Sequence, residues 1–243
     1  MRALCMKTEF TLPVKKFDGI GALLYAVSML TLMYGLSTIT DAGSIFLAGF
    51  GLILFAVFVW YELRSTHPLL HVRLFFENKR FARSSYAALL NYAAVYAVTY
   101  MVSLYLQSVG QLNAAEAGMI MLFQPLIQVV ATPVAGKISD KVDAKYLVTG
   151  GMILTIVGLL FLSGLGLSMT NVAGYIMITQ VFIALGAALF SAPNTSTIMG
   201  SVAPAEYSMA SSVVSVVRQA GMLISMAVCM AVVSVFVGGT DML

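Results

Sequence analysis

The 243-residue chain is 60% hydrophobic and only 9% charged, with a formal net charge of +3. A soluble globular domain carries roughly 25% charged residues, so this composition excludes the soluble class. The net charge is too small to indicate a nucleic-acid partner. We therefore expect the lipid bilayer to surround most of the chain.

Seven apolar stretches are long enough to cross a bilayer as helices. A spanning helix needs about 20 mostly apolar residues, because the hydrocarbon core is roughly 30 Å thick. Barrel strands would alternate apolar and polar residues over about ten positions, whereas these runs are continuous. The sequence thus predicts an all-α, polytopic membrane bundle of about seven transmembrane helices. The expected helices are 18–38, 44–61, 84–107, 115–135, 146–168, 173–195 and 206–237.

Basic residues alternate between successive connections, and this alternation predicts the orientation. They gather before the first helix, in 62–83 and in 136–145, whereas the connections near Asp41, Gly110 and Thr170 contain none. Cytoplasmic loops of membrane proteins carry an excess of lysine and arginine. We expect a multi-pass cell-membrane protein whose N-terminus is cytoplasmic and whose C-terminus lies outside.

Four of the expected helices carry a polar face, with side chains spaced so that they share one side of the helix. Lipid offers no hydrogen bonds, so such faces turn toward protein or a water-filled cavity. Each face taken singly also fits helix–helix packing, but four together predict a shared substrate cavity. The expected cavity residues are Tyr92, Tyr96, Gln124, Gln128, Gln180, Asn194 and Arg218.

Arg218 is the one basic residue inside an expected span. An arginine within a membrane helix costs at least ~2.5 kcal/mol on insertion scales, so it usually faces a cavity or a partner. The alternative is that the helix extends into the cytoplasm and the side chain reaches the interface. The sixteen methionines likewise fit either a pliable binding surface or ordinary apolar filler.

The sequence carries no sign of a metal site, a cofactor or an enzyme. His67 and His71 are four residues apart, but Pro68 breaks the helix that such a metal site would need. Cys5 and Cys229 show no metal-ligand spacing, and we expect both to be free thiols. We find no nucleophile elbow, phosphate loop or zinc-protease motif.

The segment 136–145 predicts a tight, charged cytoplasmic turn. We expect Gly136 to end a helix, with Asp140 following it among lysines. Asp140 is expected to cap the next helix or to pair with a basic group on a neighbour. Such a pair would hold one conformation closed and break in the other. The expected cytoplasmic gate is Gly136, Asp140, Lys141 and Lys145.

This turn resembles the G-x-x-x-D-[RK]-x-G-[RK]-[RK] signature of the major facilitator superfamily, in the copy of the C-terminal half. Asp143 stands where that signature has a glycine. Further segments are similar to the fourteen-span drug/proton antiporter branch (QacA/EmrB type), and the resemblance covers residues 17 to 235. They are F-D-x-x-G-A at 17–22, H-P-L-L at 67–70, L-F at 74–75, R-F at 80–81, P-N-T at 193–195 and R-Q-x-G at 218–221.

The resemblance implies an incomplete C-terminal half of a major facilitator fold. It divides the chain into a cytoplasmic segment 1–17, two extra central helices in 18–61, a basic cytoplasmic loop 62–83 and a partial five-helix transporter domain 84–243. Facilitators rock two six-helix halves about a central site. The resemblance therefore also implies that a separate chain supplies the missing half, or that the chain is a truncated or split product.

The resemblance implies export of small lipophilic or cationic substrates in exchange for protons. No acidic residue lies deep in an expected span, since Asp18 and Glu116 sit at helix edges, so no proton carrier is indicated. A non-transporting membrane subunit or a truncated remnant remains an alternative. A seven-helix receptor would place its N-terminus outside, and a retinal protein would need a lysine in its last helix.

Overall fold

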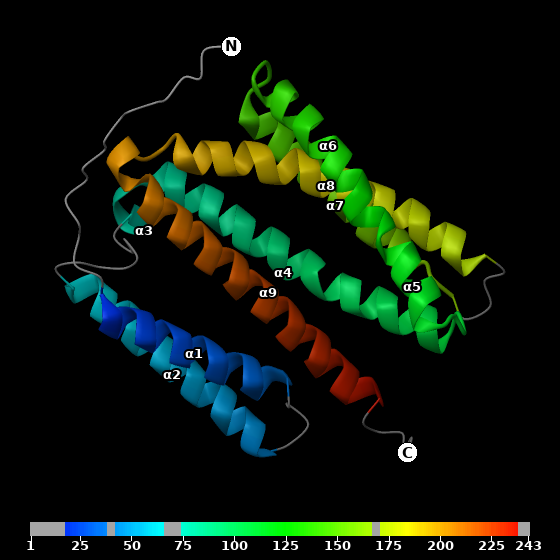
Figure 1. The fold of residues 1–243 in the computed structure, drawn as a ribbon, viewed down its shortest axis with the longest axis horizontal. Coiled ribbons are helices and arrows are strands. Elements are labelled where there is room, and N and C mark those ends of the chain that lie inside the picture. The colour runs from blue at the N-terminus through cyan, green and yellow to red at the C-terminus, as the bar shows by residue number, and fades with distance from the viewer. Residues whose placement is uncertain (1–17, 38–41, 66–73, 167–170, 238–243) are drawn as a thin grey trace, which may run out of the picture.

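The computed structural model describes residues 18–37, 42–65, 74–166 and 171–237, and within them the regular structure is entirely helical (Figure 1). This confirms the all-α prediction. The helices are α1 Gly19–Ser37, α2 Ala42–Arg64, α3 Leu74–Glu77, α4 Lys79–Ser108, α5 Ala114–Met121, α6 Phe123–Ser139, α7 Ala144–Ser163, α8 Val172–Met199 and α9 Tyr207–Val237, with a 3-10 turn at Pro204–Glu206 before α9.

Six helical stretches in the described part are long and apolar enough to cross a membrane, with α5 and α6 counted together as one. The remaining predicted span, α1, offers the shorter apolar stretch Gly19–Gly35. It packs along α2, so it belongs to the bundle. Large apolar side chains on the outside of the bundle, such as Phe46, Val129 and Val130, are exposed as lipid-facing residues are.

The span predicted at 115–135 is interrupted at Leu122, so the prediction of one continuous helix is wrong there. Pro125 explains the break, because it has no N–H to donate to the carbonyl of Met121. The chain keeps its direction, since the Leu126 N–H donates to the Leu122 carbonyl at 3.2 Å. The two pieces together run from Ala114 to Ser139.

The expectation of a loop through 62–83 is also wrong for its described part. Helix α2 continues to Arg64, and α4 begins at Lys79. Asn78 caps α4, because its side-chain oxygen accepts the N–H groups of Arg80 and Phe81, each at 3.1 Å. This cap residue was overlooked in the sequence, where the helix was expected to start at 84.

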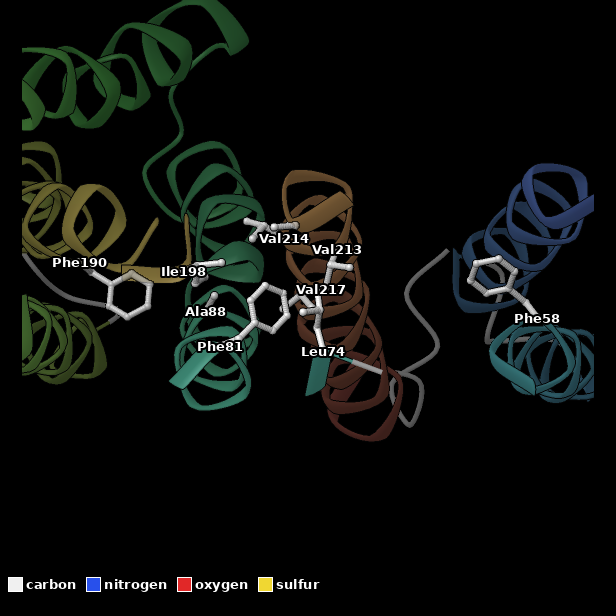
Figure 2. Close-up of a cluster of buried hydrophobic side chains, with 10 residues drawn as sticks. Phe58, Leu74, Phe81, Ala88, Phe190, Ile198, Val213, Val214 and Val217 are labelled. Atoms are coloured by element: carbon white, nitrogen blue, oxygen red, sulfur yellow. The ribbon is translucent and has the colours of Figure 1, made fainter. Parts of the chain in front are cut away.

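Helix α8 lies at the centre of the bundle formed by α4 to α9, with α6 and α7 along one side and α4 along another (Figure 1). Helix α4 packs in turn against α9, and α1 is the element that joins the α1–α2 pair to α9. The cores between these helices are apolar. Figure 2 shows Phe190 and Ile198 meeting Phe81 and Ala88, with the valines of α9 on the far side.

Small residues set the closest helix contacts. A Cβ added at Gly151 of α7 would lie 2.7 Å from the Gly186 carbonyl oxygen of α8, and one at Gly221 of α9 would lie 2.7 Å from that of Leu89 on α4. Membrane helices associate through such close packing, because lipid supplies no hydrophobic force between them. Gly221 therefore fixes the spacing of the helix pair that carries the candidate site.

Candidate substrate cavity and the turn at 136–145

A cavity of about 610 Å³ lies between α1, α4 and α9, and Met121 of α5 contributes to its wall. This volume is within the range of small-molecule sites, which is roughly 300–1,000 Å³. We call it the methionine cavity, because five of its residues are methionines. Its lining residues are Met33, Tyr96, Thr99, Tyr100, Ser103, Met121, Gln219, Met222, Leu223, Met226 and Met230.

The cavity forms because one face of α4 meets one face of α9. The two helices run in the same direction, since Gly221 contacts Leu89 and, one turn on, the Ala97 N–H donates to Ser225 Oγ at 2.9 Å. Methionines at 222, 226 and 230 recur once per turn of α9 and so share a face. Hydroxyl-bearing side chains of α4 face them. The cavity is therefore mostly pliable and apolar, with a polar edge.

A second, much smaller cavity of about 20 Å³ lies deeper, where α4, α5–α6, α7 and α8 meet. It has room for about one water molecule. We call it the glutamine pocket, because Gln124 and Gln180 line it together with Thr99 and Thr179. Thr99 and Met121 line both cavities, so the glutamine pocket adjoins the methionine cavity.

Gln180 and Thr179 are the two buried polar residues of this pocket, 4% and 1% exposed. The Gln180 Oε1 has no hydrogen-bond partner within the described chain. The Thr179 hydroxyl is already used, since it donates to the Tyr175 carbonyl at 3.0 Å. An unmatched buried acceptor typically costs about 1–3 kcal/mol, so the pocket is chemically suited to a hydrogen-bond donor.

Tyr92 and Arg218 lie one turn before the methionine cavity, on α4 and α9 respectively. The Arg218 guanidinium carbon lies 5.6 Å from the Tyr92 ring centroid, within reach of a cation–π interaction. Its neighbour Gln219 lines the cavity and accepts a hydrogen bond from the Tyr25 hydroxyl of α1 at 3.1 Å. The arginine thus stands beside the cavity rather than in its wall.

The predicted cavity residues therefore divide among different places. Tyr96 lines the methionine cavity, whereas Gln124 and Gln180 line the glutamine pocket. Asn194 is buried, and its side-chain amide donates to the Ser84 carbonyl at 3.1 Å, which ties α8 to α4. Gln128 lines neither of these two cavities.

Several lining residues were missed in the sequence. Gln219 and Tyr100 were not among the predicted site residues, and neither were the cavity methionines. The repeat of methionine at 222, 226 and 230 was the available signal, because a spacing of four keeps side chains on one helix face. Nothing in the sequence showed that α1 would bring Met33 to the same place.

The turn at 136–145 differs from its prediction in two ways. Helix α6 continues to Ser139, so Gly136 lies inside the helix instead of ending it. Asp143, not Asp140, caps α7, since its Oδ1 accepts the Lys145 N–H at 3.2 Å. Asp143 has φ −54°, so the position where the signature has glycine needs no left-handed backbone here.

The Asp140 carboxylate is exposed and makes no hydrogen bond or ion pair with another described residue. Lys141 and Lys145 are exposed beside it. The turn therefore presents one carboxylate and two ammonium groups that are not engaged with each other. The Lys145 ammonium lies 5.7 Å from the centroid of the neighbouring Tyr146 ring.

One buried acidic residue lies at the end of α2, beyond the predicted end of that span at 61. Glu62 is only 3% exposed and stands two residues before the last residue of the helix, Arg64. A Cβ at Gly21 would lie 2.7 Å from Glu62 Oε1 and 2.9 Å from Asp18 Oδ2, so the two carboxyl groups share one end of the α1–α2 pair. The Tyr61 hydroxyl donates to Asp18 Oδ1 at 3.2 Å.

Within the described residues, no three histidine, cysteine or acidic side chains group so that they could hold a metal ion. His67 and His71 lie outside those residues.

Comparison with known families identifies the family of this chain. The family model described as the Major Facilitator Superfamily matches residues 84–238. The chain belongs to this superfamily. It is therefore a multi-pass membrane protein of a transporter family.

Curated relatives of this chain are named for different substrates. It is 30% identical to the riboflavin transporter RibZ of Clostridioides difficile, over 84% of this chain and 44% of that protein. It is 24% identical to the multidrug resistance protein Stp of Mycobacterium tuberculosis, over 93% of this chain and 42% of that protein. It is 22% identical to the lincomycin resistance protein LmrB of Listeria monocytogenes, over 89% of this chain and 44% of that protein. The chain spans less than half the length of these relatives.

Proposed function

We propose that the chain is part of a proton-coupled multidrug efflux transporter of the fourteen-span branch, acting on small lipophilic or cationic substrates. The observation that carries this proposal is the methionine cavity of about 610 Å³. Methionine side chains adapt to ligands of different shape, and aromatic rings attract cations. A mostly apolar wall with a few hydroxyl groups fits substrates that share lipophilicity more than any particular group.

The α1–α2 pair supports the assignment to the fourteen-span branch. The resemblance identifies these helices as the two extra central spans, and α1 contributes Met33 to the cavity wall. The Tyr25 hydroxyl holds α1 to Gln219 of α9. The extra pair would then shape the substrate site instead of serving only as a linker.

Transport by this chain would need an opposite wall. The described helices surround the methionine cavity on the α1, α4 and α9 sides, and facilitators alternate access by moving two halves about such a site. We propose that a second half, in a separate chain or elsewhere in a longer protein, faces it. Gly136, Asp140, Lys141 and Lys145 would form the cytoplasmic gate between the halves, with the N-terminus cytoplasmic and the C-terminus outside.

The test is ethidium accumulation in cells that lack their own efflux pumps and express this chain together with the second half. Expression should lower the steady-state level of intracellular ethidium severalfold, and a protonophore should restore it. Unchanged accumulation would contradict efflux. If accumulation falls but the protonophore does not restore it, the efflux proposal stands and only proton coupling is contradicted.

Flavin transport is a second candidate, and the relative RibZ favours it. The rings of Tyr96 and Tyr100 in the methionine cavity offer stacking surfaces to a flat heterocycle. Riboflavin fluorescence reports binding directly. Saturable quenching by the purified protein, without competition from lipophilic cations, would favour this candidate over drug efflux.

A further inference from the structure

The glutamine pocket contains one buried polar atom that has no hydrogen-bond partner in the described structure, Gln180 Oε1. The half-buried Gln124 and the exposed Thr99 also line the pocket. Buried polar groups in native proteins are nearly always paired with protein or ordered water. The pocket is thus built to receive a polar group.

The volume limits what that group can be. About 20 Å³ accommodates a single water molecule or a group of that size, such as a hydroxyl or an ammonium. Apolar side chains, among them Val98, Val102 and Ile176, complete the walls. Because the unmatched Gln180 atom is an acceptor, the incoming group must donate.

The position of the pocket connects it to the proposed substrate site. Thr99 and Met121 line both the glutamine pocket and the methionine cavity. A ligand whose apolar body fills the larger cavity therefore has a short route for one terminal group into the smaller one. The flexible side chain of Met121 stands at the junction, and movement about its three rotatable bonds would widen the passage.

We propose that the glutamine pocket is a substrate subsite for one water-sized hydrogen-bond donor, which Gln180 Oε1 accepts. A water molecule occupies it when the substrate lacks such a group. The preferred substrates are then lipophilic molecules that carry a terminal hydroxyl or amine. This inference rests on the proposed function, because it places the body of the substrate in the methionine cavity.

Two matched probes test this preference: (4-hydroxybutyl)triphenylphosphonium and butyltriphenylphosphonium, which differ by one terminal hydroxyl. Their dissociation constants are measured on the full chain in lipid nanodiscs. The hydroxylated probe should bind about fivefold more tightly, as expected for one net hydrogen bond. Gln180→Leu should abolish that preference, so that the two probes bind this variant with equal affinity.

Gln128→Leu is the matched control, because Gln128 is the same residue type on α6 and lines neither cavity. It should keep the fivefold preference. Replacing the unmatched Gln180 amide by an apolar group of similar size should not destabilise the protein, and thermal unfolding checks this.

The remaining outcomes separate this inference from the proposed function. If both probes bind the wild type equally, or if the preference survives Gln180→Leu, the subsite is wrong and the drug cavity stands. If neither probe binds the wild type, the proposed lipophilic-cation site itself is wrong and the subsite is rejected with it.

Discussion

The Arg218 guanidinium of α9 lies over the Tyr92 ring of α4, 5.6 Å from its centroid, one turn from the methionine cavity. A cation–π contact at such a site contributes roughly 0.5–1 kcal/mol. It keeps a fixed positive charge beside the cavity and out of its wall. For a site that we propose takes cations, this position matters, because a free arginine would repel them.

Tyr92→Leu should release this guanidinium and weaken binding of tetraphenylphosphonium about two- to fivefold, the equivalent of the lost contact. Tyr92→Phe keeps the aromatic face and should bind as the wild type does. Equilibrium dialysis with the radiolabelled cation measures both. Equal affinities for the Leu and Phe variants would show that the ring does not restrain Arg218.

Gly221→Val should separate α4 from α9, because a Cβ there would lie 2.7 Å from the Leu89 carbonyl oxygen. Overpacking of this kind costs about 1–3 kcal/mol, which for a chain of this size lowers the melting temperature by about 5 °C. Gly150→Val is the control, because a Cβ at Gly150 meets nothing within 4 Å. Similar melting temperatures for the two variants would contradict the close contact.

Asn194→Asp should lower stability without changing probe affinity in the protein that remains folded. The Asn194 amide donates to the Ser84 carbonyl, and an aspartate oxygen in its place would face that carbonyl without a proton to share. Thermal unfolding and probe titration on the same sample measure the two effects separately. A loss of affinity at full stability would instead make Asn194 a cavity residue.

Asp140→Asn should abolish efflux in a complete transporter while membrane insertion remains normal, because the exposed carboxylate is proposed to act on a neighbouring element. Asp143→Asn is the matched control. Asparagine caps helices as well as aspartate does, so the α7 cap is kept and efflux should persist. Dye efflux and membrane fractionation provide the readouts, and full efflux by Asp140→Asn would reject the gate.

The proposed orientation predicts opposite labelling of two connections. In a variant without Cys5 and Cys229, Lys141→Cys should react with a membrane-impermeant maleimide only after the cells are opened. Asn113→Cys, between α4 and α5, should react in intact cells. Both sites are exposed. The reverse pattern would invert the topology that the basic residues predict.

The ends of the helices show what local sequence signals can predict. Apolar runs located the helices, but Asn78, which extends α4 toward the N-terminus, was recognised as a cap only in the structure. The break at Leu122 follows from Pro125, which has no N–H to donate, and the prediction from apolar runs did not include this effect. At 136–145 the residue types predicted a charged turn, yet which aspartate capped α7 depended on where α6 ended.

The candidate site was predictable only in part, for a physical reason. Side-chain spacing shows which residues share a helix face, but not which neighbour that face meets. Tyr96 and Gln124 were both expected in one cavity, and the structure places them in adjoining ones. Asn194 looked like a cavity residue, and it bonds to the backbone of α4.

The sequence by itself determined that lipid surrounds the chain, that the chain is helical and which family it resembles. These properties depend on composition and on contacts along the chain. Long apolar runs must be helical in lipid, whatever surrounds them. Only the tertiary structure decided that α9 would set its methionines against the hydroxyl face of α4, since Gly221 permits an approach that no local pattern specifies. The burial of Gln180 likewise depends on how α8 packs against α4 to α7.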